Sequence, residues 1–392
     1  MDEELRSEVA ELRLTVRAFL ENKAPESVVR DIADRGMDRD SGLWRQMAEQ
    51  LGLQGLMVPE EFGGQGTTFV EMAAVLEETG RALLGGPFLS TSVLGAGALL
   101  LSGDTDAMKN HLPGVSEGTT TATVAFSEGF SGREGESTVT ASQEGEDWVL
   151  SGQVDSVLDG CGADLILVVA PTGEGLGLFA VAGDADGCER APLTTLDQTR
   201  PMGRLQLVRV AAHRVGGDFT VAQRQLLALG ATAVAADLAG ATGRVLEMAV
   251  DYAKVREQFG QPIGAFQAVK HLCVDIFVAA ESALSVARYA ARVSVESPEH
   301  LREAASLAKA YTSEACVAAA EKNIQVHGGI GYSWEHPAHL YLRRVKAAEF
   351  LFGGASYHRD ELAMVLGLAK DIHGPVTSPD VEGDWRSARG TG

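Results

Sequence analysis

Hydrophobic residues recur at helical spacing at the start of the chain. Apolar positions three and four residues apart predict an amphipathic helix, with Leu5, Val9, Leu12, Val16, Phe19 and Leu20 on its buried face. The same reasoning predicts helices over 43–51, 69–79 and 90–101, while the glycine-rich run 59–66 is predicted to be a loop. We therefore expect residues 1–118 to form a helical domain.

The spacing of hydrophobic residues changes from helical to strand-like at about residue 119 and returns to helical at about residue 217. Six short β-branched or alternating runs predict strands of a compact β-barrel or sandwich over 119–216: 121–126, 138–141, 148–154, 165–170, 176–182 and 205–210. Four helical patterns then follow and predict a four-helix bundle over 217–372: 222–255, 268–293, 300–326 and 338–368. This separation of helices from strands predicts an α+β fold. The tail, 373–392, is rich in Pro and Gly and is expected to be disordered.

The composition of the chain argues against several classes of binding partner. The 392 residues carry a formal net charge of −21, which argues against nucleic acid and against an anionic membrane surface as partners. The four cysteines are scattered without a C-x-x-C pair, so no metal site is predicted and a reducing cytoplasm is expected. The acidic N-terminus argues against a signal peptide, and no uninterrupted apolar run predicts a membrane span.

Two glycine-containing stretches lie at predicted helix ends. The first runs from Arg256 to Gln267, and the second from Gln325 to Tyr332. Taken alone, each is explained by helix termination, with Gly260 as a C-terminal cap and Arg256 favoured by the helix dipole.

Together the two stretches resemble signatures of the acyl-CoA dehydrogenase family of flavoproteins. The first is similar to R-x-Q-F-G-x-x-I-x-x-F-Q and the second to Q-x-x-G-G-x-G-Y, and a third match covers 53–66. The resemblance implies an N-terminal helical domain, a middle β-barrel domain and a C-terminal four-helix bundle.

The resemblance also implies FAD as cofactor. Arg256 is then expected at the pyrophosphate and Phe259 near the adenosine, while Gln325 and the backbone of Gly328 and Gly329 bind FAD from the neighbouring subunit. Ser127 replaces the Thr of the family's T-E-P-x-x-G-S-D stretch, whose Pro and Ser-Asp are absent from 126–133. The family's W-I-T-N strand corresponds to 156–159, without the Trp and the Thr.

The catalytic base is missing from both positions at which the family places it. α,β-Dehydrogenation requires a carboxylate that removes the α-proton of the thioester. Ungapped counting places one family position at Phe352 or Gly353, and the other at Gly230-Ala231. Asp237 is an alternative base, although a lone acid in an apolar helix is more often paired structurally. His327 is expected to pack or cap rather than catalyse.

The stretch 334–344 resembles actinobacterial members that lack the base and pair with a related subunit. The expected function is therefore FAD-dependent dehydrogenation of an acyl-CoA, with the base supplied by a partner in a homo-oligomer or heteromer, and with electrons passed to a separate acceptor. Two alternatives stay open: a non-catalytic structural or regulatory subunit, and a self-sufficient enzyme that uses Asp237. Small residues over 230–240 indicate either close helix packing or room for a bulky acyl group such as a steroid side chain.

Overall fold

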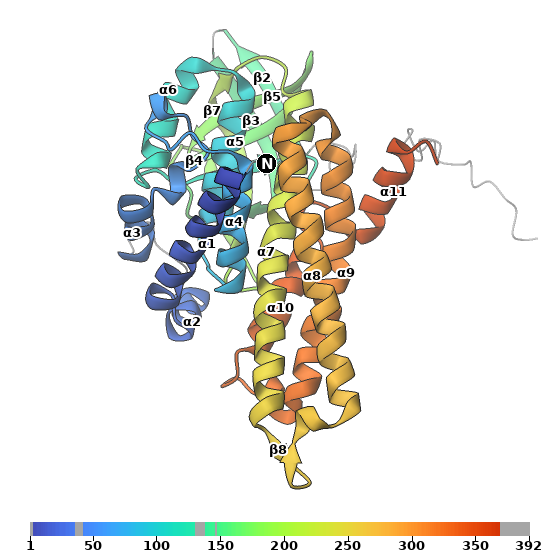
Figure 1. Ribbon diagram of the computed structural model, residues 1–392. Coiled ribbons are helices and arrows are strands. Elements are labelled where there is room, and N and C mark those ends of the chain that lie inside the picture. The colour runs from blue at the N-terminus through green and yellow to red at the C-terminus, as the bar shows by residue number, and fades with distance from the viewer. Residues whose placement is uncertain (1–2, 36–41, 130–137, 146, 369–392) are drawn as a thin grey trace, which may run out of the picture.

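The chain folds into a curled sheet flanked by helices and a long helical bundle (Figure 1). The structure is a computed structural model that describes residues 3–35, 42–129, 138–145 and 147–368. The predicted disordered tail, 373–392, and the part of the T-E-P-like run from Phe130 to Arg133 lie outside the described residues.

The N-terminal region is helical, as predicted. Its α-helices are α1 (Glu3–Lys23), α2 (Glu26–Arg35), α3 (Gly42–Leu51), α4 (Phe69–Arg81), α5 (Ala96–Ser102) and α6 (Thr105–Ser116). Helix α4 begins with a capping box in which Thr68 and Glu71 satisfy each other's backbone donors. A π-helix, η3 (Leu89–Gly95), leads directly into α5. The predicted loop at 59–66 contains only the short 3-10 helix η2 (Glu60–Phe62).

The middle region is one mixed sheet that curls on itself. Its strands are β1 (Ala122–Phe126), β2 (Val139–Glu144), β3 (Asp147–Leu158), β4 (Leu165–Thr172), β5 (Gly175–Ala182), β6 (Cys188–Leu193) and β7 (Met202–Val215). The order is β1-β4-β5-β7-β3-β2, with β6 also paired to β7, and only the β1–β4 pair is parallel. β1 contacts β3, and β2 contacts β4, although neither pair is adjacent in this order, so the sheet curls back on itself. The predicted barrel is therefore a curled sheet, and β6 was not predicted.

The C-terminal region is built from α7 (Thr220–Val255), α8 (Gln267–Glu296), α9 (Leu301–His327), α10 (Ala338–Ala348) and α11 (Ala355–Val365). The fourth predicted helix, 338–368, is in fact two helices. They are separated at 349–354, where Phe352 and Gly353 have φ of 59° and 99° and cannot continue a right-handed helix. Helix α7 is long and apolar enough to cross a membrane, but most of its apolar stretch is buried inside this protein.

The small residues of α7 permit a close approach to α4. A Cβ on Gly240 would lie 1.7 Å from the Glu77 carbonyl oxygen, and one on Gly80 would lie 2.0 Å from the Asp237 carbonyl oxygen. Any side chain at either glycine would force the helices apart. Small residues were predicted to serve either close helix packing or a bulky acyl group, and at these positions the structure shows close helix packing.

Candidate active site

Five predicted cofactor residues gather where α7 and α9 end. Arg256 and Phe259 follow α7, while Gln325, Gly328 and Gly329 lie at the end of α9. The two helix ends are held together because the Tyr252 ring stacks on the His327 ring with centroids 4.4 Å apart. His327 is buried and its Nδ1 is 2.8 Å from the Asn323 carbonyl oxygen, which agrees with its predicted packing role. We call these five residues the flavin-motif surface.

The turn that carries Phe259 differs from the predicted helix cap. Helix α7 ends at Val255, and Gly260 instead occupies a two-residue turn between β8 (Glu257–Gln258) and β9 (Gln261–Pro262). Phe259 and Gly260 both have positive φ, 53° and 76°, as a tight hairpin turn of this length favours. This conformation is unfavourable for a bulky side chain, and such strain is typical of functional positions.

The flavin-motif surface is open. The Phe259 side chain is 92% exposed, and its only ring contact in the described part of the chain is an edge contact with Phe266 at 6.0 Å. Arg256 and Gln325 are also exposed, and a Cβ on Gly328 or Gly329 would meet nothing within 4 Å. A cation, a flat apolar ring and bare backbone on one accessible surface fit the pyrophosphate and adenosine of a dinucleotide.

Ser127 lies elsewhere. It follows β1, is buried, and its backbone N–H donates to the Val169 carbonyl oxygen at 3.2 Å. The sheet is at the upper end of Figure 1 and the β8 hairpin at the lower end. One copy of the chain therefore does not bring Ser127 together with the flavin-motif surface.

The stretch that corresponds to W-I-T-N ends in a polar contact. Asp159, at φ 52°, accepts a 2.6 Å hydrogen bond from the Ser90 hydroxyl of the π-helix. Burial raises the pKa of Asp159 to about 6, against the opposing effects of the Ser90 hydrogen bond and Arg200. The sheet and the N-terminal helices thus meet at this strand end.

The two positions predicted for the family's base lie against each other. A Cβ added to Gly230 would be 2.6 Å from Cε1 of Phe352, so the ring packs directly on the glycine. Phe352 is only 2% exposed. Two sequence positions more than a hundred residues apart therefore converge on one place, and an aromatic ring fills it. We call residues 349–354 the Phe352 turn.

Buried polar side chains hold the Phe352 turn. The Lys309 ammonium donates to the carbonyl oxygens of Glu349 and Gly353 at 2.9 and 3.0 Å, and to the Ser313 hydroxyl at 2.8 Å. His358 places Nε2 2.9 Å from the Phe352 carbonyl oxygen and Nδ1 3.1 Å from the Ser306 hydroxyl. Burial lowers the pKa of Lys309 to about 7 and that of His358 to about 4. Sequence reasoning missed both residues, although a lysine between Ala308 and Ala310 is a signal of a buried amine.

Asp237 does not fit the role of base that was one of the alternatives. It is buried, and its Oδ1 lies 2.7 Å from Arg200 and 2.9 Å from Arg344. Arg344 also pairs with Asp197 at 2.9 Å and donates to the Leu84 carbonyl oxygen. Both ion pairs engage this carboxylate inside the protein, so Asp237 is part of a buried structural network. The network joins the sheet region to α7, α10 and the end of α4.

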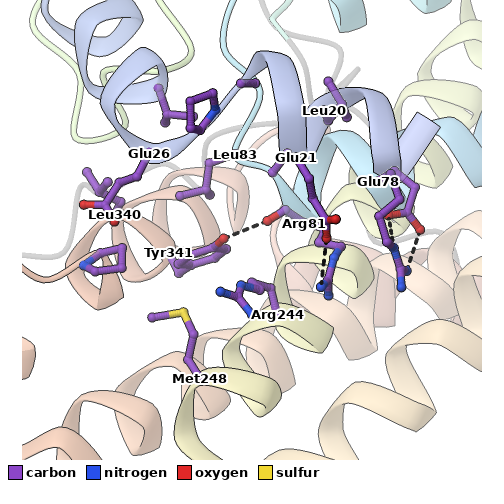
Figure 2. Close-up of a pocket in the computed structure, with 16 residues that line it drawn as sticks. Leu20, Glu21, Glu26, Glu78, Arg81, Leu83, Arg244, Met248, Leu340 and Tyr341 are labelled. Carbon is purple, nitrogen blue, oxygen red and sulfur yellow. Dashed lines mark hydrogen bonds and ion pairs between the residues drawn. The ribbon is translucent and has the colours of Figure 1, made fainter. Parts of the chain in front are cut away.

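A cavity of about 340 Å³ lies between α1, α2, α4, α7 and α10 (Figure 2). Its cations are paired: Arg17 binds Glu78 at 2.8 Å, and Arg81 and Arg244 bind Glu247 at 2.6 and 3.0 Å. Tyr341 donates its hydroxyl to the Arg81 carbonyl oxygen at 2.7 Å. The cavity shares no residue with the flavin-motif surface or the Phe352 turn, so it is a separate feature.

Comparison with known proteins agrees with this geometry. Residues 6–119 match the model of the acyl-CoA dehydrogenase N-terminal domain, and residues 217–367 match that of the acyl-CoA dehydrogenase C-terminal domain. The acyl-CoA dehydrogenase IpdE2 of Mycolicibacterium smegmatis is 34% identical over 343 residues, which are 87% of this chain and 93% of the relative.

Two solved structures of paired subunits are similar throughout. The Tcur3481-Tcur3483 steroid ACAD G363A variant superposes with a TM-score of 0.83 at 30% identity, over 93% of this chain and 99% of that one. The ChsE4-ChsE5 complex from Mycobacterium tuberculosis gives 0.84 at 30% identity, over 92% and 98%. On these grounds the chain belongs to the acyl-CoA dehydrogenase family.

Proposed function

We propose that this chain takes part in FAD-dependent α,β-dehydrogenation of an acyl-CoA, as one subunit of an oligomer whose catalytic base comes from a partner. The packing of Phe352 on Gly230 carries this proposal. It fills the place where the two family base positions meet, and neither residue can accept a proton. Asp237, the remaining acid considered, is committed to two arginines.

The cofactor part of the proposal rests on the flavin-motif surface. Arg256 would hold the pyrophosphate, Phe259 would pack near the adenosine, and the bare backbone of Gly328 and Gly329 would allow close approach. The bound flavin supplies the hydride acceptor. Because Ser127 lies far along the molecule, it would serve a flavin whose nucleotide end is held by the flavin-motif surface of a second subunit.

Paired subunits among the similar structures support a heteromer with a related acyl-CoA dehydrogenase chain. One of them is described as a steroid ACAD, and by analogy the acyl group is bulky and steroid-derived. Within this proposal the protein is cytoplasmic and passes its electrons to a separate acceptor.

The test compares visible spectra of the purified chain, alone and with a co-expressed related subunit, before and after anaerobic addition of mixed acyl-CoAs. We expect flavin that bleaches only in the complex. Arg256→Ala should remove flavin from the complex, while Arg224→Ala, an exposed arginine near the other end of α7, should leave it in place. A flavin that bleaches in the chain alone contradicts the missing base.

The alternative of a non-catalytic subunit makes a different prediction. If this chain only stabilises a true dehydrogenase, Arg256→Ala leaves flavin content and bleaching of the complex unchanged. The exposed, strained Phe259 favours the shared flavin site, because a purely structural subunit has no use for that conformation.

A further inference from the structure

A second cavity, of about 330 Å³, opens between α1, α4 and α8. It shares no residue with the flavin-motif surface, the Phe352 turn or the buried network around Asp237. Its lining is Arg6, Val9, Arg13, Val70, Ala73, Glu77, Ser285, Arg288, Tyr289, Ala291 and Arg292. We call it the arginine groove. Its volume is within the usual range for a small-molecule site.

The charges of the arginine groove are unbalanced. Among the lining residues, four arginines face a single carboxylate, Glu77, which is an excess of three positive charges. Glu78, outside the lining, lies 3.9 Å from Arg13. Glu77 is buried and is held by Arg13 at 3.0 Å and by Arg288 at 2.8 Å. Arg6 and Arg292 form no ion pair with any side chain that the structure describes.

The cavity of Figure 2 provides a comparison within the same molecule. It has nearly the same volume, but its three arginines face three glutamates, Glu21, Glu26 and Glu78. Each of those arginines has an ion-pair partner within 3.0 Å. The excess of cations is thus particular to the arginine groove. It stands out because the chain as a whole carries −21, a field that repels anions unless a local site attracts them.

The groove also presents a flat ring beside its cations. On α8, Ser285 lies three and four residues before Arg288 and Tyr289, and Arg292 lies four and three residues after them, so the four share one face of the helix. Tyr289 is 45% exposed and can stack on a planar group. Guanidinium groups bind phosphate oxygens in pairs, and the buried Glu77 fixes the two arginines nearest to it.

We propose that the arginine groove binds a nucleoside diphosphate moiety. The two phosphates lie between Arg6 and Arg292, and the ring stacks on Tyr289. The moiety comes either from a free nucleotide or from the nucleotide part of coenzyme A. This inference does not rest on the proposed dehydrogenase function, because no residue is shared.

The test is calorimetric titration of ADP, coenzyme A and inorganic pyrophosphate into the full-length chain at low salt. The Arg6→Gln/Arg292→Gln double variant should weaken ADP binding by about tenfold or more. Arg45→Gln/Arg224→Gln, which removes the same two charges from exposed positions on α3 and α7, should leave the affinity within about twofold. Thermal unfolding of each variant verifies that the fold is intact.

The flavin-motif surface also suits an ADP moiety, so the Arg256→Ala variant is used to distinguish ADP binding there from ADP binding in the groove. ADP binding that survives Arg256→Ala and is lost in the double variant supports the groove, whatever the flavin content of the complex. Binding that is lost only in Arg256→Ala, or no ADP binding to the wild type at millimolar concentration, overturns it. Pyrophosphate that binds as tightly as ADP contradicts the contact with Tyr289. If coenzyme A binds the wild type and loses affinity in the same variants as ADP, the nucleotide part of coenzyme A is a ligand of the groove. If coenzyme A does not bind, the ligand is a free nucleotide.

Discussion

The flavin-motif surface and the Phe352 turn are two parts of one expected active site, and they differ in almost every physical respect. The flavin-motif surface keeps the family residues but leaves them exposed, with Phe259 in a strained conformation that few contacts within the chain support. The Phe352 turn has no carboxylate at the position predicted for the family base, and it is packed and hydrogen-bonded, with the Phe352 ring on Gly230 and the Lys309 ammonium on two carbonyl oxygens. Contacts within the chain leave the first exposed, while they fill and satisfy the second.

This difference indicates which part of the expected site has a role in binding and which has a role in stability. A side chain with few internal contacts and an unfavourable φ has a cost, and a partner or ligand is the reason to retain it. A buried ring such as that of Phe352 needs none of the partners that a buried carboxylate requires away from water. Each of the following experiments tests whether stability resides at the Phe352 turn and function at the flavin-motif surface.

The largest effect on stability is expected from Lys309→Met. The substitution keeps the length of the side chain but leaves the carbonyl oxygens of Glu349 and Gly353 without this donor. Unsatisfied buried groups cost about 1–3 kcal/mol each, so the free energy of unfolding should fall by roughly 3 kcal/mol. Chemical denaturation measures the change. Lys322→Met, on the same helix as Lys309, breaks an exposed pair with Asp275 of α8 and should cost less than about 1 kcal/mol. Equal losses in the two variants would contradict the special role of Lys309.

The Phe352 turn should also weaken in acid through His358. Its pKa is about 4 in the folded protein, below the ordinary value of about 6.5 that applies in the unfolded chain. Between these values the unfolded state binds more protons, so stability falls as pH falls from about 6.5 to about 4, by roughly 2 to 3 kcal/mol.

Denaturation curves of wild type and His358→Gln across this range isolate the effect. The difference between them removes other titrating groups such as Asp159, whose pKa is raised to about 6 and whose contribution has the opposite sign. A difference that does not change with pH would show that the pKa of His358 is the same in the folded and unfolded chain.

Two glycine-to-alanine substitutions on α7 should change the stability of the protein in opposite directions. Gly230→Ala would push a methyl group into the Phe352 ring, and overpacking of this kind costs about 1–3 kcal/mol. Gly243→Ala, thirteen residues further along α7, meets nothing within 4 Å and should stabilise the helix by up to about 1 kcal/mol. Thermal unfolding of both variants is the measurement. A Gly230→Ala protein as stable as Gly243→Ala would mean that the ring moves aside freely.

The sequence predicted the parts of the molecule that local patterns determine. Helical and strand periodicity located the three regions, and the glycine motifs placed Arg256 and Gln325 at helix ends, although they did not predict that these ends adjoin each other. Counting from the family motifs predicted that the base positions fall at Phe352 or Gly353 and at Gly230-Ala231, but nothing in the sequence showed that Gly230 and Phe352 touch. The split of the last predicted helix was missed because the positive φ of Phe352 depends on the buried groups around it. Asp237 was left open as a base, since its arginine partners come from a loop and a helix distant in sequence.

The smallest effect on stability is expected at Phe259, where the effect on function should be large. Glycine adopts positive φ without cost, and the exposed ring contributes little more than an edge contact with Phe266. Phe259→Gly should therefore change the free energy of unfolding by less than about 1 kcal/mol, because relief of strain opposes the lost contact. The flavin content of the purified complex should nevertheless fall, since the flat ring that would pack near the adenosine is gone. Leu14→Gly, at another exposed apolar position but on α1, would cost helix stability and leave the flavin in place. If Phe259→Gly lowers stability as much as Gly230→Ala while flavin stays bound, the ring is structural and the contrast between the two parts of the site fails.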